Sequence, residues 1–142
     1  MPASPFPSIQ QIPLGKMERG LARPMATLTL EPAEITQRLG VQFETTQDDL
    51  DELDAAVICS GTGRQFALVR HRHQPVPGTD ILTNERSADL SADLRDALHV
   101  LQFEPTELRW THPGIEVKDL HQVSHIGETS RELPAPKRTS KK

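Results

Sequence analysis

Four consecutive residues, Arg70, His71, Arg72 and His73, form a dense group of basic side chains in an otherwise acidic central region. Guanidinium groups bind carboxylate and phosphate oxygens in pairs, and histidine adds positive charge below about pH 6.5. We therefore predict a partner-binding edge that recognises an anion or an acidic peptide. The acidic run at residues 48–54 offers a second interpretation, because it could pair with the basic run within one chain or between two copies.

The two histidines of this group could instead bind a metal ion. Residues two apart in an extended strand face the same side, so His71 and His73 could share a zinc ion if a third protein ligand were nearby. His112, His121 and His125 are available in the sequence, and His112 is the candidate for that ligand. Arg70 and Arg72 argue against such a site, because they would repel a cation. We predict no metal, cofactor or catalytic residue, and keep a metal-binding protein or small enzyme using these histidines as the alternative.

Other patterns in the sequence lack a catalytic signature. Residues 60–64 (SGTGR) are rich in glycine, but a strand is expected after them, whereas phosphate-binding loops lead into a helix. Residues 48–54 lack the glycine and glutamate positions of a calcium-binding EF-hand loop. Cys59 is the single cysteine, so an internal disulfide is excluded. This cysteine usage is typical of a protein in the reducing cytoplasm.

The elements that position these residues are those of a small α+β fold. Apolar residues at 55–59 and 65–69 flank the glycine-rich turn and predict a β-hairpin. Further strands are expected at residues 26–30, 41–45, 79–83 and 107–111. Leucines and alanines spaced three and four apart predict the main amphipathic helix, at residues 87–103 with Ser87 as N-cap. A second helix is expected at 31–39, opened by Pro32 and ended by Gly40.

We therefore predict a mostly antiparallel sheet of four or five strands packed against the helix at 87–103, with the helix at 31–39 nearby. The domain is expected at residues 25–118. Residues 1–24 are rich in proline, which predicts a disordered N-terminal extension. Alternatively, translation begins at Met17 or Met25. Residues 119–142 predict a flexible basic tail.

The function expected from these observations is a non-catalytic protein-interaction or regulatory module, with a protein partner or self-association. The acidic domain disfavours nucleic-acid binding through the core. A second alternative is therefore a nucleic-acid-associated factor that acts through the basic C-terminal tail. Because the chain lacks a run of about 20 apolar residues, no membrane association is expected. We expect the protein in the cytoplasm.

Overall fold

The computed structural model describes residues 9–47, 51–116, 118 and 120. Within these residues the chain forms seven strands, two α-helices and two short 3₁₀ helices. The strands are β1 (Gln10–Ile12), β2 (Leu21–Leu28), β3 (Glu44–Gln47), β4 (Glu52–Cys59), β5 (Gln65–His71), β6 (Thr79–Asn84) and β7 (Leu108–Thr111). The helices are α1 (Pro32–Leu39) and α2 (Leu90–Leu101), and the 3₁₀ helices are η1 (Leu14–Lys16) and η2 (Pro105–Glu107).

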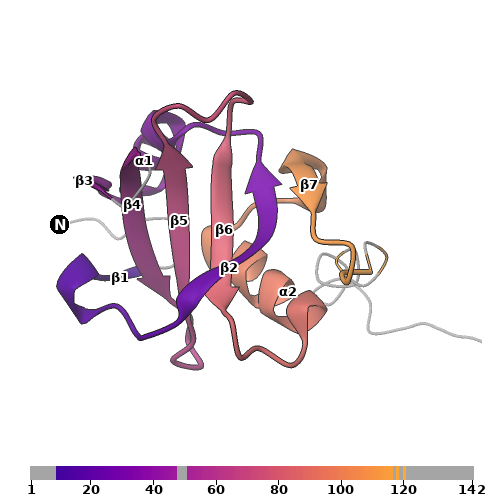
Figure 1. Ribbon diagram of the computed structural model, residues 1–142. Helices are drawn as coiled ribbons and strands as arrows, with labels where there is room; N and C mark the ends of the chain where they lie inside the picture. The colour runs from indigo at the N-terminus through magenta and orange to yellow at the C-terminus, as the bar shows by residue number, and fades with distance from the viewer. Residues whose placement is uncertain (1–8, 48–50, 117, 119, 121–142) are drawn as a thin grey trace, which may run out of the picture.

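All strands belong to one antiparallel sheet in the order β1-β4-β5-β6-β2-β7 (Figure 1). β3 lies beside β1 along the same edge of β4, since it pairs with residues 52–55 while β1 pairs with residues 57–59. The predicted α+β class is confirmed. The predicted count of four or five strands is too low, because short strands such as β1 carry too few residues to show an alternating pattern.

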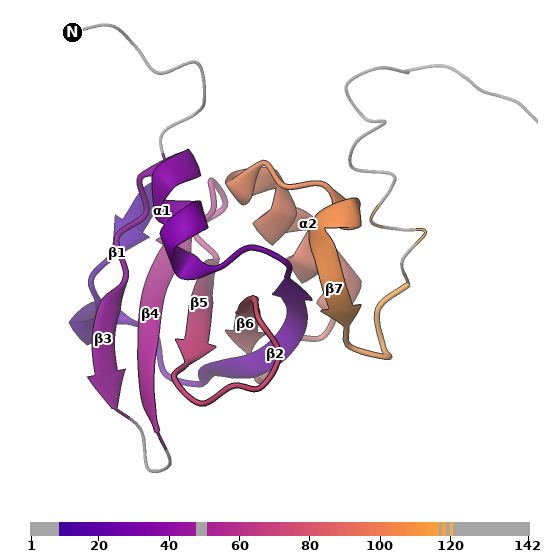
Figure 2. The ribbon, with the colours of Figure 1, turned by 90° about the horizontal axis from the view of Figure 1, so that it is seen from above.

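The sheet has two apolar faces, as the unbroken apolar runs of β4 and β5 require. On one face, side chains including Ile58, Phe66 and Leu68 pack against α1 and α2 in the larger core. Both helices lie on this side of the curved sheet, behind it in Figure 1 and above it in Figure 2. On the opposite face, alternate residues of the same strands form a smaller apolar cluster that includes Val57 and Val69.

The main helix α2 begins later than predicted. Asp89 is its N-cap, and the Asp89 side chain accepts a hydrogen bond from the Ala92 N–H at 3.1 Å. Ser87, the predicted N-cap, instead donates its hydroxyl hydrogen to Asp93. The predicted apolar stripe is confirmed, because Leu94, Leu98 and the other apolar residues of the stripe are buried. The helix ends at a left-handed Gln102, shortly before Pro105.

The second helix α1 follows the prediction closely. Pro32 stands at its first position, where the missing N–H costs no hydrogen bond. Glu31 is the N-cap, and its N–H donates to the Glu34 carboxylate at 2.9 Å. Gly40 ends the helix at φ 78°, a left-handed conformation that glycine adopts readily. Ile35 is fully buried and anchors α1 to the larger core.

The fold begins before the expected boundary at residue 25. β1, η1 and the first residues of β2 lie within the segment predicted as an extension. β2 continues through Pro24 at an irregularity in its pairing with β6, a place where a sheet tolerates proline. Residues 1–8 and most of the predicted tail at 119–142 lie outside the described residues, so their predicted disorder stays a prediction. Leu120, within that tail, is buried in the larger core.

Candidate functional site

The basic residues singled out from the sequence lie where β5 ends and a loop begins. Arg70 and His71 are the last residues of β5, and residues 72–78 form the connection to β6, which we call the 72–78 loop. Pro75 and Pro77 within this loop have no N–H to donate. The loop therefore depends on side chains for much of its hydrogen bonding.

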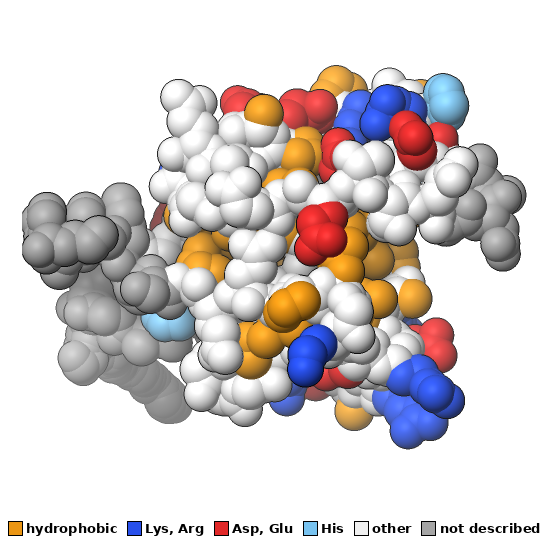
Figure 3. Space-filling view, turned by 90° about the vertical axis from the view of Figure 1, so that its left-hand side faces the viewer, with side chains coloured by type: hydrophobic (Ala, Val, Ile, Leu, Met, Phe, Trp, Pro, Cys, Tyr) orange, Lys and Arg blue, Asp and Glu red, His pale blue; other side chains and the backbone are white. Residues whose placement is uncertain are grey.

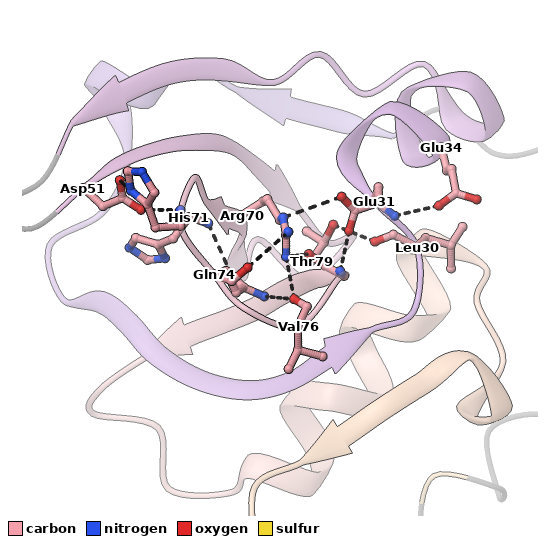
Figure 4. Close-up of polar contacts among 11 residues, drawn as sticks. Leu30, Glu31, Glu34, Asp51, Arg70, His71, Gln74, Val76 and Thr79 are labelled. Carbon is pink, nitrogen blue, oxygen red and sulfur yellow. Dashed lines mark hydrogen bonds and ion pairs between the residues drawn. The ribbon is translucent and has the colours of Figure 1, made fainter.

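Arg70 holds the 72–78 loop from inside (Figure 4). Its guanidinium group donates to three loop carbonyls, at 2.6 Å to Val76, 3.3 Å to Gly78 and 3.4 Å to Gln74. Its Nε lies 3.6 Å from Glu31 Oε1. The Arg70 side chain is 18% exposed. It is therefore a residue that shapes the loop.

Glu31 completes this arrangement from the start of α1. It accepts a hydrogen bond from the N–H of Gly78, while Thr79 Oγ1 donates to Leu30 O at 2.7 Å. Gly78 has φ 127°, and a Cβ there would collide with the carbonyl oxygen of Leu28. The end of β5, the loop and the N-terminal end of α1 are thus tied together by side chains far apart in sequence.

Arg72 and His73 are paired with the acidic segment that precedes β4 and begins it. Arg72 lies 2.9 Å from Glu52, and both side chains are about half exposed. The His73 N–H donates to Asp51 at 2.7 Å, and the His73 ring nitrogen Nδ1 lies 2.6 Å from the same carboxylate. Figure 3, which faces the edge formed by β1 and β3, shows acidic, basic and histidine side chains together at its upper right. The within-chain pairing expected as one interpretation is therefore observed.

The Asp51 carboxyl group has a pKa below its ordinary value of 3.8. The largest cause is the hydrogen bond from the backbone N–H of His73, and the His73 side chain and the N–H of Glu52 act in the same direction. Partial desolvation opposes them. The carboxylate is therefore ionised at neutral pH and available to fix the start of the loop.

The structure does not bring the three candidate zinc ligands together. His71 and His73 flank the end of β5, whereas His112 follows β7, and its N–H donates to Met25 O. β6 and β2 lie between these strands, which separates them by about 14 Å at the usual strand spacing. Among the described residues, no group of three or more His, Cys, Asp or Glu side chains is placed to hold a metal ion.

A shallow depression of about 600 Å³ lies beside the 72–78 loop. Acidic, histidine and small apolar side chains share its lining. They are Asp51, His71, His73, Gln74, Pro75, Val76 and Asp80. Val76 is 46% exposed, which is high for an apolar side chain. The depression and the exposed side chains of Arg72 and His73 thus form one surface around the loop. The partner-binding role predicted for Arg70, His71, Arg72 and His73 stays a prediction.

A buried carboxylate was missed in the sequence. Asp93 is 2% exposed and accepts hydrogen bonds from Ser87 and, at 2.9 Å, from Thr83. It also forms an ion pair with Arg64. Spacing could have revealed it, because Asp93 lies three residues after the buried Leu90 and four before the buried Ala97. This network joins the β4–β5 hairpin, β6 and α2.

No described helix is long and apolar enough to cross a membrane. Comparisons of the chain with protein-family models, with curated proteins and with solved structures found no match.

Proposed function

We propose that this protein is a small non-catalytic interaction module that binds a protein partner through the surface around the 72–78 loop. The observation that carries the proposal is the clamp formed by Arg70, which fixes a loop that exposes Val76, Arg72 and His73. A loop already held in one conformation loses little entropy on binding, so more of the contact energy appears as affinity.

The exposed side chains indicate what the partner supplies. Val76 offers a small apolar contact, 46% exposed. Arg72 and His73 are 52% and 84% exposed and retain donor capacity beyond their pairing with Glu52 and Asp51. The expected partner surface therefore combines an apolar side chain with nearby carboxylate or carbonyl oxygens. The partner is a different protein or a second copy of this chain.

The four basic residues predicted from the sequence to bind a partner have different roles in this proposal. Arg70 is assigned to positioning the loop, because its guanidinium group is directed at Val76, Gly78 and Gln74. Arg72 and His73 are assigned to contact with the partner. We further propose that the protein acts in the reducing cytoplasm, because its single cysteine cannot form an internal disulfide. The alternative function, a nucleic-acid-associated factor, depends on basic residues of the C-terminal tail that lie outside the described residues.

Charge reversal tests the proposal. We expect Arg72→Glu to reduce association with the partner by at least about tenfold, because it places a like charge against the partner's acceptors. Arg109→Glu is the matched control, since Arg109 is also exposed and lies on β7, the edge strand three places from β5 in the sheet. Quantitative recovery of partners with each tagged variant from cells of the native organism gives the comparison. Equal recovery with Arg72→Glu and Arg109→Glu would reject the assignment.

A further inference from the structure

A cavity of about 480 Å³ lies on the face of the sheet opposite the helices. We call it the outer cavity. Its deepest lining comes from small side chains of β4 and β5, namely Ala55, Val57, Ala67 and Val69. Leu14 and Met17, from η1 and the residue after it, line its side.

The side chains that line the outer cavity are almost all apolar. Among the described residues that line the outer cavity, none is Asp, Glu, Lys or Arg. Thr46 and His71 supply the polar side chains of the lining. A charged ligand would lose its hydration there without gaining a countercharge. The lining therefore favours a ligand that is neutral over most of its surface.

The floor of the outer cavity is almost fully covered by neighbouring side chains. Val57 is 0% exposed, Ala67 is 2% exposed and Val69 is 7% exposed. These side chains are already covered by their neighbours, so an occupant contacts mainly the more exposed lining, such as Met17 and Ala22. The volume of the outer cavity falls in the range of pockets that hold small molecules, about 300–1,000 Å³.

We propose that the outer cavity binds a compact, largely apolar small molecule that carries one hydrogen-bonding group. The apolar body lies beside Met17 and Ala22, above the floor that includes Ala55 and Ala67, and the polar group lies toward Thr46 and His71. This site adjoins the partner surface of the 72–78 loop, because His71 lines both the outer cavity and the depression beside the loop, whereas Arg72 and Val76 do not line the outer cavity.

The probe for the test is N-phenyl-1-naphthylamine, a neutral apolar dye whose fluorescence rises in an apolar environment. We expect the full-length protein to give a saturable rise in fluorescence with one dye per chain. Ala55→Leu fills the floor of the outer cavity and is expected to weaken dye binding by at least about tenfold. Ala22→Phe narrows the cavity from an exposed position of β2, so it keeps the test valid if Ala55→Leu fails to fold.

Ala33→Phe is the control for Ala22→Phe, because Ala33 is also exposed but lies on α1, away from the outer cavity. It is expected to bind the dye as the unaltered protein does, and so is Arg72→Glu. Absence of a saturable signal in the unaltered protein would overturn the proposal. So would full dye binding by Ala22→Phe, or an equal loss of binding in Ala33→Phe. Loss of the partner with retained dye binding in Arg72→Glu, or loss of dye binding with a retained partner in Ala22→Phe, shows that the outer cavity and the 72–78 loop act separately.

Discussion

Arg70 Nε lies 3.6 Å from Glu31 Oε1 and joins the end of β5 to the N-terminal end of α1. The same guanidinium group donates to carbonyls of the 72–78 loop, and Glu31 accepts the N–H of Gly78. This ion pair and these hydrogen bonds together join a strand, a helix and the loop between β5 and β6. The shape of the proposed partner surface depends on it.

Removal of the Arg70 side chain is expected to destabilise the fold. Arg70→Ala leaves three loop carbonyls without their donor, and we expect a loss of about 1–3 kcal/mol in the free energy of unfolding. Arg72→Ala removes an exposed ion pair, for which a loss below about 1 kcal/mol is expected. Urea unfolding of both variants checks the difference. Equal losses would mean that Arg70 does not hold the loop.

Gly78 is expected to tolerate no side chain. Its φ of 127° is unfavourable for other residues, and a Cβ would meet the carbonyl oxygen of Leu28. We expect Gly78→Ala to lower the free energy of unfolding by at least about 2 kcal/mol. Gly61→Ala is the control, because no atom lies within 4 Å of a Cβ at that position. Thermal unfolding that shows the same loss in both variants would contradict the predicted clash.

The lowered pKa of Asp51 gives a pH dependence of known sign. Because this pKa lies below 3.8 in the folded protein, the ionised carboxylate stabilises the fold at neutral pH. The stabilisation is present above the unfolded pKa and is lost as the pH falls through the folded pKa. We therefore expect Asp51→Asn to be less stable than the unaltered protein at about pH 6, with a difference that shrinks below about pH 3.8.

Titration of the Asp51 carboxyl carbon by NMR tests the cause as well as the sign. The largest contribution comes from the backbone N–H of His73, so His73→Ala is expected to keep most of the lowered pKa. A return of the Asp51 pKa to its ordinary value in His73→Ala would show that the imidazole side chain, and not the backbone, dominates.

The buried Asp93 is expected to contribute strongly to stability. Asp93→Asn removes the ion pair with Arg64 and weakens acceptance from Ser87 and Thr83, so we expect a loss of about 2 kcal/mol or more. Asp96→Asn, on the same helix, changes a carboxylate that is partly exposed and accepts one long hydrogen bond of 3.4 Å. A loss below about 1 kcal/mol is expected there. Urea unfolding of the pair would contradict the account if Asp96→Asn were the more damaging change.

Local signals in the sequence were sufficient for several elements. Pro32 and Gly40 mark the two ends of α1, and the apolar stripe marks α2. The N-cap of α2 was misjudged because Ser87 and Asp89 both suit that role, and the tertiary contact of Ser87 with Asp93 decides between them. β1 was missed because a strand of three residues gains its stability from pairing with β4, far along the chain.

The contacts of the candidate site were likewise predictable from the sequence in part only. The glycine-rich turn predicts the β4–β5 hairpin, and the hairpin register in turn brings the acidic and basic runs together, as the pairs Arg72–Glu52 and His73–Asp51 show. The role of Arg70 could not be predicted from local pattern. It arises because the 72–78 loop, with two prolines, folds back so that its carbonyl oxygens face the Arg70 guanidinium group.

The measurement that tests the partner surface most directly is site-specific photo-crosslinking in cells of the native organism. A benzophenone amino acid replaces Val76 in one variant and Trp110 in another, because these side chains are 46% and 44% exposed and lie on different segments, the 72–78 loop and β7. We expect a discrete crosslinked species, with another protein or a second copy of the chain, from position 76 and none from position 110. No crosslink from position 76, or the same species from both positions, would contradict the assignment of the 72–78 loop as the partner-binding surface.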